Sequence, residues 1–420
     1  MTIAIEAYIR KHLKFNFAIG LLDGSFFGLG MGFASFAAII PLFVNHLTDS
    51  ALIIGLVPAI HNVGWQLPQL FTAGWVSRAK RYRPLVLIMT ISERVPFLGL
   101  AAIAFFLLKI SPSIALILVL LMLIWQGIGA GLAANPWASM ISKVMPDELR
   151  GTFFGTQSAA YNGAAGLSAI AAALILDKVA EPFNFSLLFT LTFFSMVISF
   201  IFLSLTREPV CEPKEIHHTH ILWKKALSIL KNDGNFRAFL LVRIISQFAA
   251  MGFSFYTIYV VQHFGMSDAA ASIMVSVLLL AQIILSPLMG RWGDKWSHRS
   301  VMLIGALGAA LSEFLAWQAP STNWFYGIFV LEAVAIIAIW TVPLAFSVSF
   351  AKNDEDRPLY IGMASTIPAP ATIIAPIIGG WLADVIGFNA TFIASALSGL
   401  IMAIALWMLV KDSKANKIIG

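Results

Sequence analysis

Twelve apolar stretches, most of them longer than 20 residues, follow one another along this 420-residue chain and constrain its fold more than any other feature. A helix needs about 20 apolar residues to cross the hydrocarbon core of a bilayer. The first stretch is longer than the core of a signal peptide, and another follows it at once, so we expect it to be retained. The predicted spans are 15–44, 51–73, 84–108, 113–142, 152–177, 184–206, 236–263, 269–292, 300–319, 324–350, 359–386 and 389–411.

The composition agrees with a membrane protein. Hydrophobic residues make up 59% of the chain and charged residues 11%, whereas soluble proteins average about 45–50% and about 25%. Disordered chains are poor in apolar residues, so disorder is excluded as well. A single cysteine, Cys211, rules out an internal disulfide and a multi-cysteine metal site. No glycine precedes a lysine, so the phosphate loop of nucleotide-driven pumps is absent. We expect no cofactor and no metal.

The basic residues predict the orientation of the chain. With twelve spans, all but four of the 27 lysines and arginines fall on the side that holds both termini. The exceptions are Arg94, Lys109, Lys178 and Arg243. Positive charge collects on the cytoplasmic side of membrane proteins. We therefore expect a multi-pass protein of a prokaryotic plasma membrane (the inner membrane where there are two), with cytoplasmic termini. The basic charge reflects topology, and no nucleic-acid partner is expected.

The two halves of the sequence repeat each other. PDELRGTFFG (146–155) matches NDEDRPLYIG (353–362), and GWVSRAKRYR (74–83) matches GRWGDKWSHR (290–299). Several matches in the same order indicate six helices followed by six more, joined by a polar loop whose Trp223–Leu230 portion could lie along the membrane surface as a short helix. The predicted divisions are an N-terminal segment 1–14, a first bundle 15–206, a central loop 207–235, a second bundle 236–411 and a tail 412–420.

The loop GRWGDKWSHR resembles the G-x-x-x-D-[RK]-x-G-[RH]-[RK] signature of the major facilitator superfamily. The resemblance implies an all-α membrane fold, with twelve helices in two pseudo-symmetric six-helix bundles around a central cavity. It also implies transport of a solute by alternating access. The implied cytoplasmic gate residues in the second half are Gly290, Asp294 and Arg299. Their first-half counterparts are Gly74, Arg78 and Arg83, with Arg78 where the family has an acid.

A second family signature, G-x-x-x-G-P-x-x-G-G in span five, marks many proton-driven drug exporters. Span five here reads NGAAGLSAIAAAL and lacks the proline. The sequence therefore leaves both directions of transport open.

A few ionisable residues fall inside the spans, where charge is costly and normally functional. By the resemblance, spans one, four, seven and ten line the cavity, which puts Asp23, Arg243 and Glu332 first as proton-coupling or gating residues. Asp23 and Arg243 form either a switchable pair or a permanent ion pair. Glu332 is either a proton carrier or a neutral acid bonded to a neighbour.

Three further ionisable residues in the spans are expected to have structural roles. Glu93 and Arg94 are neighbours in sequence, so we expect them to point apart and not to pair. Glu313 is expected at the membrane interface.

Neutral polar residues are the candidates for the cavity wall, and each has helix joining as its alternative role. The candidates are Asn62, Gln66, Gln126, Asn135, Tyr161, Asn162, Gln247, Ser254, Gln282 and Trp340. In span one, Gly20, Gly24, Gly28 and Gly32 recur every four residues. Such a stripe predicts close approach of another helix.

The sequence thus predicts a secondary transporter of a small organic solute that is driven by protons, embedded in lipid as a monomer, and not an enzyme. An uncoupled facilitator, a multidrug exporter and a non-transporting membrane receptor of the same fold are the alternatives. Solute flux and its response to pH distinguish them.

Overall fold

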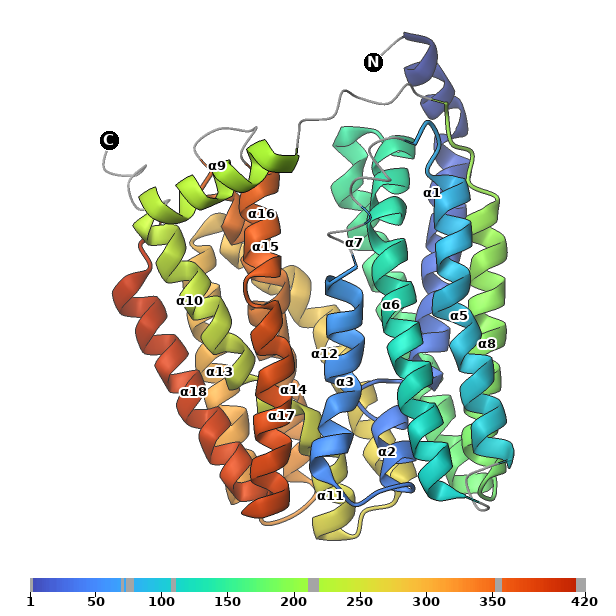
Figure 1. Ribbon diagram of the computed structural model, residues 1–420, viewed down its shortest axis with the longest axis vertical. Helices are drawn as coiled ribbons and strands as arrows, with labels where there is room; N and C mark the ends of the chain where they lie inside the picture. Colours follow the sequence, from blue (N-terminus) through green and yellow to red (C-terminus); the bar gives the residue numbers. More distant parts are fainter. Residues whose placement is uncertain are drawn as a thin grey trace. The chain divides into compact units, whose positions relative to one another are not determined.

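The chain is all-helical in the computed structural model drawn in Figure 1, which describes residues 3–68, 72, 79–106, 111–210, 219–351 and 357–412. Over these residues, ten helices are long and apolar enough to cross a membrane. They coincide with the third to the twelfth predicted spans, so these ten predictions are confirmed.

The first two spans differ from their predicted form. Predicted span 15–44 divides into α1 (Ile3–Phe33) and α2 (Ile39–Asn45). At the break, the amide of Ala37 donates to Ser35 Oγ at 3.1 Å, a local bond that competes with helix formation. The second span begins as α3 (Ala51–Gln66), a shorter apolar helix of 16 residues.

Contacts divide the chain into two compact units. Unit 1 comprises Met1–Asp49, Ile60–Ile216 and Ser267–Leu279. Its further helices are α5 (Arg83–Phe106), α6 (Pro112–Val144), α7 (Asp147–Lys178), α8 (Phe183–Ser204) and the first part of α12 (Asp268–Lys295).

Unit 2 comprises Ser50–Ala59, His217–Met266 and Leu280–Gly420. Its helices are α9 (Thr219–Asn232), α10 (Gly234–Ala249), η1 (Met251–Phe255), α11 (Tyr256–Phe264), α13 (His298–Gln318), α14 (Trp324–Ile336), η2 (Ile337–Thr341), α15 (Val342–Val348), α16 (Arg357–Thr366), α17 (Ala369–Val385) and α18 (Phe388–Leu409).

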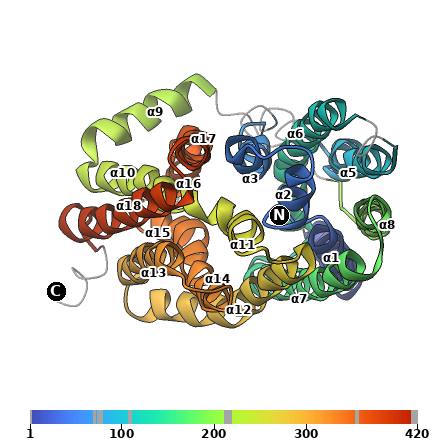
Figure 2. The same cartoon turned by 90° about the horizontal axis from the view of Figure 1, so that it is seen from below.

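The predicted repeat is visible in how helices pack within each unit. In unit 1, α1 packs on α7 and α8, and α5 packs on α6 and α8. In unit 2, the equivalent spans pair in the same way: α10 packs on α17 and α18, and α13 packs on α14 and α18 (Figure 2). Two halves with matching sequence motifs therefore also share one set of helix contacts.

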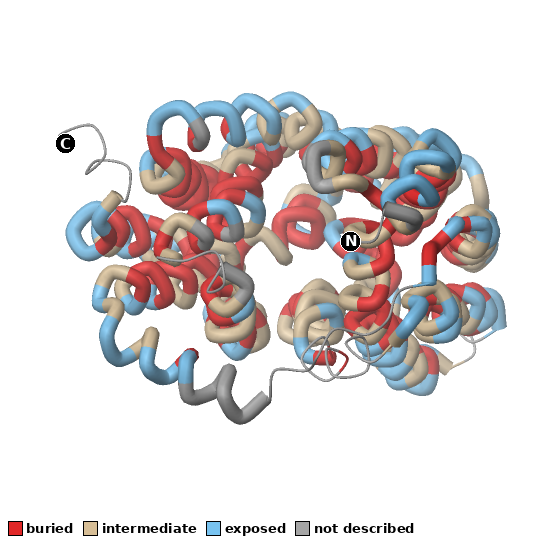
Figure 3. The backbone as a smooth tube through the Cα atoms, turned by 90° about the horizontal axis from the view of Figure 1, so that it is seen from above, coloured by how far each residue is buried: buried red, intermediate tan, exposed pale blue. Residues whose placement is uncertain are grey.

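Burial follows the pattern expected for helices in lipid. Figure 3 shows that, within each unit, the buried residues lie on the helix sides that face other helices of that unit. The exposed residues lie on the sides that face away from those helices. Large apolar side chains such as Ile88, Leu167 and Trp407 are exposed. A bilayer solvates such side chains, while the helices satisfy their own backbone groups.

Two spans of unit 2 are interrupted. The seventh contains a 3-10 turn, η1, between α10 and α11. The tenth contains a π-helical turn, η2, directly before Pro343 at the start of α15. Proline removes a backbone donor, and π-turns and 3-10 turns inside helices often occur at functional sites. In the central loop, α9 lies across the ends of α10 and α16 (Figure 1), so the predicted short helix is confirmed.

Candidate functional site

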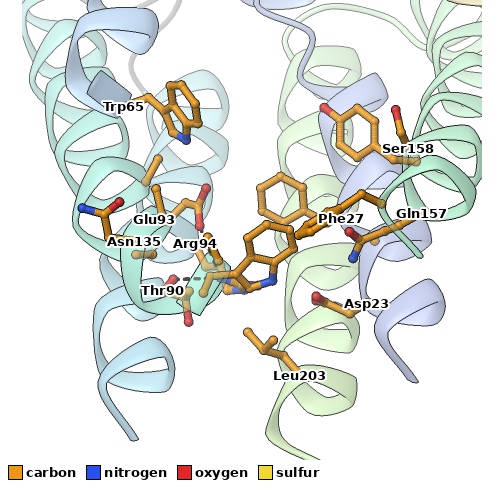
Figure 4. A pocket seen from close by; sticks show the side chains of 18 residues that line it. Asp23, Phe27, Trp65, Thr90, Glu93, Arg94, Asn135, Gln157, Ser158 and Leu203 are labelled. Carbon is orange, nitrogen blue, oxygen red and sulfur yellow. Dashed lines mark hydrogen bonds and ion pairs between the residues drawn. The ribbon is translucent and has the colours of Figure 1, made fainter. Parts of the chain in front are cut away.

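A cavity of about 540 Å³ opens inside unit 1. Its walls come from α1, α3, α5, α6, α7 and α8, and Figure 4 shows the side chains that line it. The charged lining residues that the structure describes are Asp23, Glu93 and Arg94. The aromatic lining residues are Phe27, Trp65, Trp137, Phe154 and Tyr161.

The glycine stripe of α1 places Asp23 in this cavity. Successive turns of α1 are pressed against α7: a Cβ atom on Gly28 would lie 2.3 Å from the carbonyl oxygen of Tyr161, and one on Gly32 would lie 2.2 Å from that of Ala165. Gln157 of α7 donates to the Gly20 carbonyl at 2.9 Å. The predicted close approach of another helix to the stripe is confirmed. The stripe fixes the rotation of α1 and with it the direction of Asp23.

Asp23 is buried, with 6% of its surface exposed. Its Oδ1 accepts a hydrogen bond from Ser199 Oγ at 2.6 Å. The same Ser199 Oγ accepts from Arg94 Nη2 at 3.1 Å. A chain of polar groups therefore links α1, α8 and α5 across the wall of the cavity.

Arg94 is the anchor of this network. Besides Ser199, its guanidinium donates to the carbonyls of Met196 at 3.1 Å and Thr90 at 3.2 Å. It also forms an ion pair with Glu93 at 3.5 Å. The expectation that Glu93 and Arg94 do not pair was wrong. The long arginine side chain reaches back to its neighbour because both are enclosed by α5 and α8, where an unpaired charge is costly.

The cavity carries an excess of acid. Two carboxylates, on Asp23 and Glu93, face the single guanidinium of Arg94 among the lining residues that the structure describes. The backbone bonds of Arg94 hold it against the helices, and Phe27 lies 5.7 Å from its guanidinium carbon. Aromatic faces and an uncompensated carboxylate are the features that attract an organic cation.

Two of the predicted cavity residues line this cavity. Tyr161 is on the α7 side, and Asn135 is on the α6 side, where it donates to Thr72 Oγ1 at 3.1 Å. Four other predictions in unit 1 are not among the lining residues described: Asn62, Gln66, Gln126 and Asn162. Gln126 is fully buried and bonds to His61 at 3.0 Å, which is the helix-joining role.

The remaining candidates lie in unit 2 and stay predictions as cavity residues: Ser254, Gln282, Gln247 and Trp340. Gln247 is buried and accepts from Thr372 Oγ1 of α17 at 3.1 Å, so it joins α10 to α17. Trp340 is half-buried in the π-turn η2.

The proposed pair of Asp23 and Arg243 joins different units and also stays a prediction. Arg243 is buried in unit 2, and its guanidinium donates to the carbonyl of Ile339 in η2. Glu332 is buried in the same unit. Glu313 is fully buried inside unit 2 as well, and its expected position at the membrane interface stays a prediction. Its sequence position near a span end does not reveal that α18 covers it.

The arginines of the two gate loops make matching contacts. Arg83, at the start of α5, donates to the carbonyl of Thr206 beyond α8 at 3.0 Å. Arg299, at the start of α13, donates to the carbonyl of Leu406 near the end of α18 at 3.3 Å. A cation near a helix C-terminus satisfies carbonyls that lack partners. The two arginines therefore tie the third span to the sixth and the ninth to the twelfth.

The other gate residues are described only in part. Gly290 is exposed within α12. Gly74 and Arg78 lie outside the described residues, as does the side chain of Asp294.

Glu208, which follows the sixth span, is an acid that sequence reasoning missed. Its carboxylate accepts from the amides of Tyr82 and Arg83, both at 2.8 Å, and from Lys143 Nζ at 2.8 Å. An acid bonded to the first amides of a helix is a stabilising cap. The signal available in the sequence was an acid directly after a span, in a loop otherwise rich in basic residues.

A cluster of one histidine and two acids lies between spans in unit 1. His46 follows α2, and its ring nitrogens contact Asp268 at 2.8 Å and Glu181 at 3.2 Å. The hydrogen bond to Asp268 is the main cause that raises the pKa of His46 above its ordinary value of 6.5, and burial opposes it. By the predicted topology, the cluster is on the outer side of the membrane.

The raised pKa predicts a pH-dependent contribution to stability. A histidine whose pKa is raised by folding stabilises the folded state below pH 6.5 and loses this effect as the pH rises through the raised pKa. We expect His46→Gln to lower the free energy of unfolding at pH 6 by about 0.5–1 kcal/mol, and with it the unfolding temperature. The effect is this small because the pair is partly exposed. At pH 9 the difference should be absent. Thermal unfolding of purified protein across pH measures it.

His263→Gln, at an exposed histidine stacked on Tyr259 with ring centroids 4.8 Å apart, is the matched control. An effect of His46→Gln that is equally large at pH 9 would contradict the ionic role of His46.

The geometry defines a class of protein. Ten long apolar helices, a repeated set of helix contacts and a cavity among the helices that carries charged and aromatic side chains are features of a multi-pass transport protein. The family model described as Major Facilitator Superfamily matches residues 94–261 and 239–419. The chain belongs to this superfamily of transporters.

Individual relatives are distant. The tetracycline resistance protein, class E, of Escherichia coli is 28% identical over 148 residues, which is 35% of this chain and 36% of that protein. Multidrug resistance protein 1 of Bacillus subtilis (strain 168) is 28% identical over 151 residues, which is 36% of this chain and 38% of that protein. The matches thus span little more than a third of these curated relatives.

Solved structures match over nearly the whole chain. The D-xylose-proton symporter has a TM-score of 0.72 at 18% identity, covering 95% of this chain and 98% of its own. The nucleoside transporter NupG has a TM-score of 0.75 at 13% identity, covering 94% and 100%. At these identities the likeness establishes the fold alone, and it confirms the predicted two-bundle membrane fold.

Proposed function

We propose that the protein exports amphipathic organic cations from the cytoplasm in exchange for protons. The observation that carries the proposal is the cavity of unit 1, where Asp23 and Glu93 outnumber the one described basic group, Arg94, beneath aromatic walls. An aromatic wall binds flat apolar molecules, and a buried carboxylate selects those with positive charge. The cavity volume of about 540 Å³ suits a drug-sized molecule.

The relatives support export as the direction. Two of them are named for resistance to tetracycline and to multiple drugs, and a third is the chloramphenicol resistance protein CraA of Acinetobacter baumannii. A membrane transporter can give resistance by carrying a toxic compound out of the cell. The missing proline of span five removes one exporter signature, but the acidic cavity supplies an independent reason to expect a cationic cargo.

Proton exchange is supported by Asp23. A buried carboxylate can hold a proton or a cationic solute, but not both with the same favourable energy. Binding of the solute would release the proton, and protonation from the outer side would release the solute. We propose that the protein functions in a bacterial plasma membrane with both termini in the cytoplasm, as its basic loops indicate.

Transport by purified protein in liposomes tests the proposal. Ethidium serves as the cationic probe and fluorescein as an anionic aromatic control of similar size. We expect a pH gradient to drive ethidium across the membrane at least ten times faster than in protein-free liposomes, with little movement of fluorescein. Ethidium flux whose rate does not depend on the pH gradient would indicate an uncoupled facilitator. Binding of ethidium without flux would indicate a receptor.

A further inference from the structure

Unit 2 contains a second group of buried acids, outside the cavity described above. Glu313 of α13 is fully buried, and Glu332 of α14 has 4% of its surface exposed. The charge on Glu332 acts on Glu313, and the phenol of Tyr256 lies beside Glu313. Tyr256, which begins α11, is fully buried too. Three helices therefore place ionisable groups together in the interior of one bundle.

The group lies against the break in the seventh span. Ser395 Oγ of α18 lies 3.0 Å from Glu313 Oε1 and 2.9 Å from the carbonyl oxygen of Ala249, which share its one hydroxyl proton, and it accepts from the amide of Gly252 at 3.3 Å. Gly252 is in the 3-10 turn η1, where the chain has left the α-helical path. Hydrogen bonds thus connect the carboxyl group to backbone that has no regular helical partner.

Close approach of the carboxyl group requires a glycine. A Cβ atom at position 252 would lie 2.2 Å from Glu313 Oε2 and 2.3 Å from Oε1. With the carboxyl group in this position, no side chain fits between the 3-10 turn and the acid, so any larger residue would displace the carboxyl group. The sequence and the break in the span are therefore matched to the presence of Glu313 at this depth.

Among the described residues, neither acid has a basic partner. The groups that act electrostatically on Glu313 are Ser395, Glu332 and Tyr256, and none is a cation. Arg243 of the same unit is engaged with the Ile339 carbonyl. Glu313 Oε2, Glu332 Oε2 and Tyr256 Oη are all buried, and none of them makes a hydrogen bond of ordinary geometry to a described residue, although the Tyr256 phenol lies close to Glu313.

The surroundings are apolar. The ring of Tyr256 packs on Phe325, Phe329 and Phe392 at centroid distances of 5.9, 5.9 and 5.7 Å. An ionised carboxylate in such surroundings is expensive, and two like charges close together are more so. A proton removes one charge and supplies the missing donor.

We propose that Glu313 and Glu332, with Tyr256 and Ser395, form a proton-binding site of their own at the break in span seven. At neutral pH the pair holds at least one proton. The inference extends the proposed function, in which protons drive export, by adding a second acid site in the other unit. Because η1 is bonded to the site through Ser395, loss of the proton would change the contacts that fix the shape of span seven.

Infrared spectroscopy of the protein in lipid tests proton binding without any substrate. A protonated carboxyl group gives a C=O stretching band that ionised carboxylates lack and that shifts in heavy water. We expect the double variant Glu313→Gln/Glu332→Gln to lose part of this band at pH 7. Glu6→Gln, which removes an exposed acid paired with Arg10, should leave the band unchanged.

The two single variants show whether the pair of acids holds one proton or two. If each of Glu313→Gln and Glu332→Gln loses part of the band, both acids are protonated; if only the double variant does, the pair shares one proton. A double variant with the wild-type band would overturn the site. Loss of the wild-type band when sodium chloride replaces potassium chloride at constant pH would overturn the choice of a proton and indicate sodium.

A chemical measurement on wild-type protein covers the case in which the double variant does not fold. Dicyclohexylcarbodiimide adds to protonated carboxyl groups in apolar surroundings, and mass spectrometry locates the adduct. We expect an adduct on Glu313 or Glu332; adducts confined to other residues would contradict the site. Both measurements are independent of transport, so a protein that fails to move ethidium can still show this proton.

Discussion

Asp23→Asn is expected to reduce proton-driven ethidium transport in liposomes by about ten- to a hundredfold. Asparagine keeps the size of the side chain and can still bond to Ser199, which contacts Asp23 at 2.6 Å. It removes the charge that attracts the cation and the group that carries the proton. Bonds to a charged group contribute about 1.5–3 kcal/mol, which corresponds to this range in rate or affinity.

The matched control is Glu6→Gln on the same helix, α1, where the carboxylate is exposed and pairs with Arg10 at 2.9 Å. It should transport as the wild type does. If Asp23→Asn transports ethidium at the wild-type rate with unchanged dependence on pH, Asp23 neither binds the cation nor couples it to protons.

Gly28→Ala is expected to destabilise the protein by about 3 kcal/mol and to abolish transport. The added Cβ atom would lie 2.3 Å from the carbonyl oxygen of Tyr161, and backbone cannot move aside as a flexible side chain can. Overpacking of this kind costs about 1–3 kcal/mol. Separation of α1 from α7 would also displace Tyr161 from the wall of the cavity. Thermal unfolding in detergent and ethidium transport in liposomes measure the two effects.

Gly163→Ala on α7 is the control for this prediction, because nothing lies within 4 Å of a Cβ atom built at Gly163. Alanine favours a helix over glycine by about 1 kcal/mol, so this variant should be as stable as the wild type or more so. Equal melting temperatures for Gly28→Ala and the wild type would show that α1 and α7 do not pack as described.

Much of the fold could be predicted because the membrane limits the choices. The length of an apolar helix and the alternation of basic loops give the spans, and ten of them agree with the structure. The breaks are harder to predict. The 3-10 turn at Met251–Phe255 contains no proline, and its stability depends on Ser395, which is more than 130 residues away in the sequence.

The candidate site could be predicted only in part. Asp23 was identified because an acid in a span is rare, and the glycine stripe correctly indicated that another helix packs on α1. The partners of Asp23 could not be predicted, since Ser199 and Arg94 reach it only when α5 and α8 pack together. The burial of Glu313 could not be predicted for the same reason. Depth along a helix can be read from a sequence, but the neighbour on each face cannot.

The make-up of the two units bears on how the gene can be divided. Residues 50–59 come from the first half of the chain yet belong to unit 2, where Asp384 accepts from the amide of Ala51 at 2.6 Å. Residues 267–279 come from the second half and belong to unit 1. A cut in the central loop would therefore give two polypeptides, neither of which contains all of either unit. Each fragment would have to recover a piece of its fold from the other.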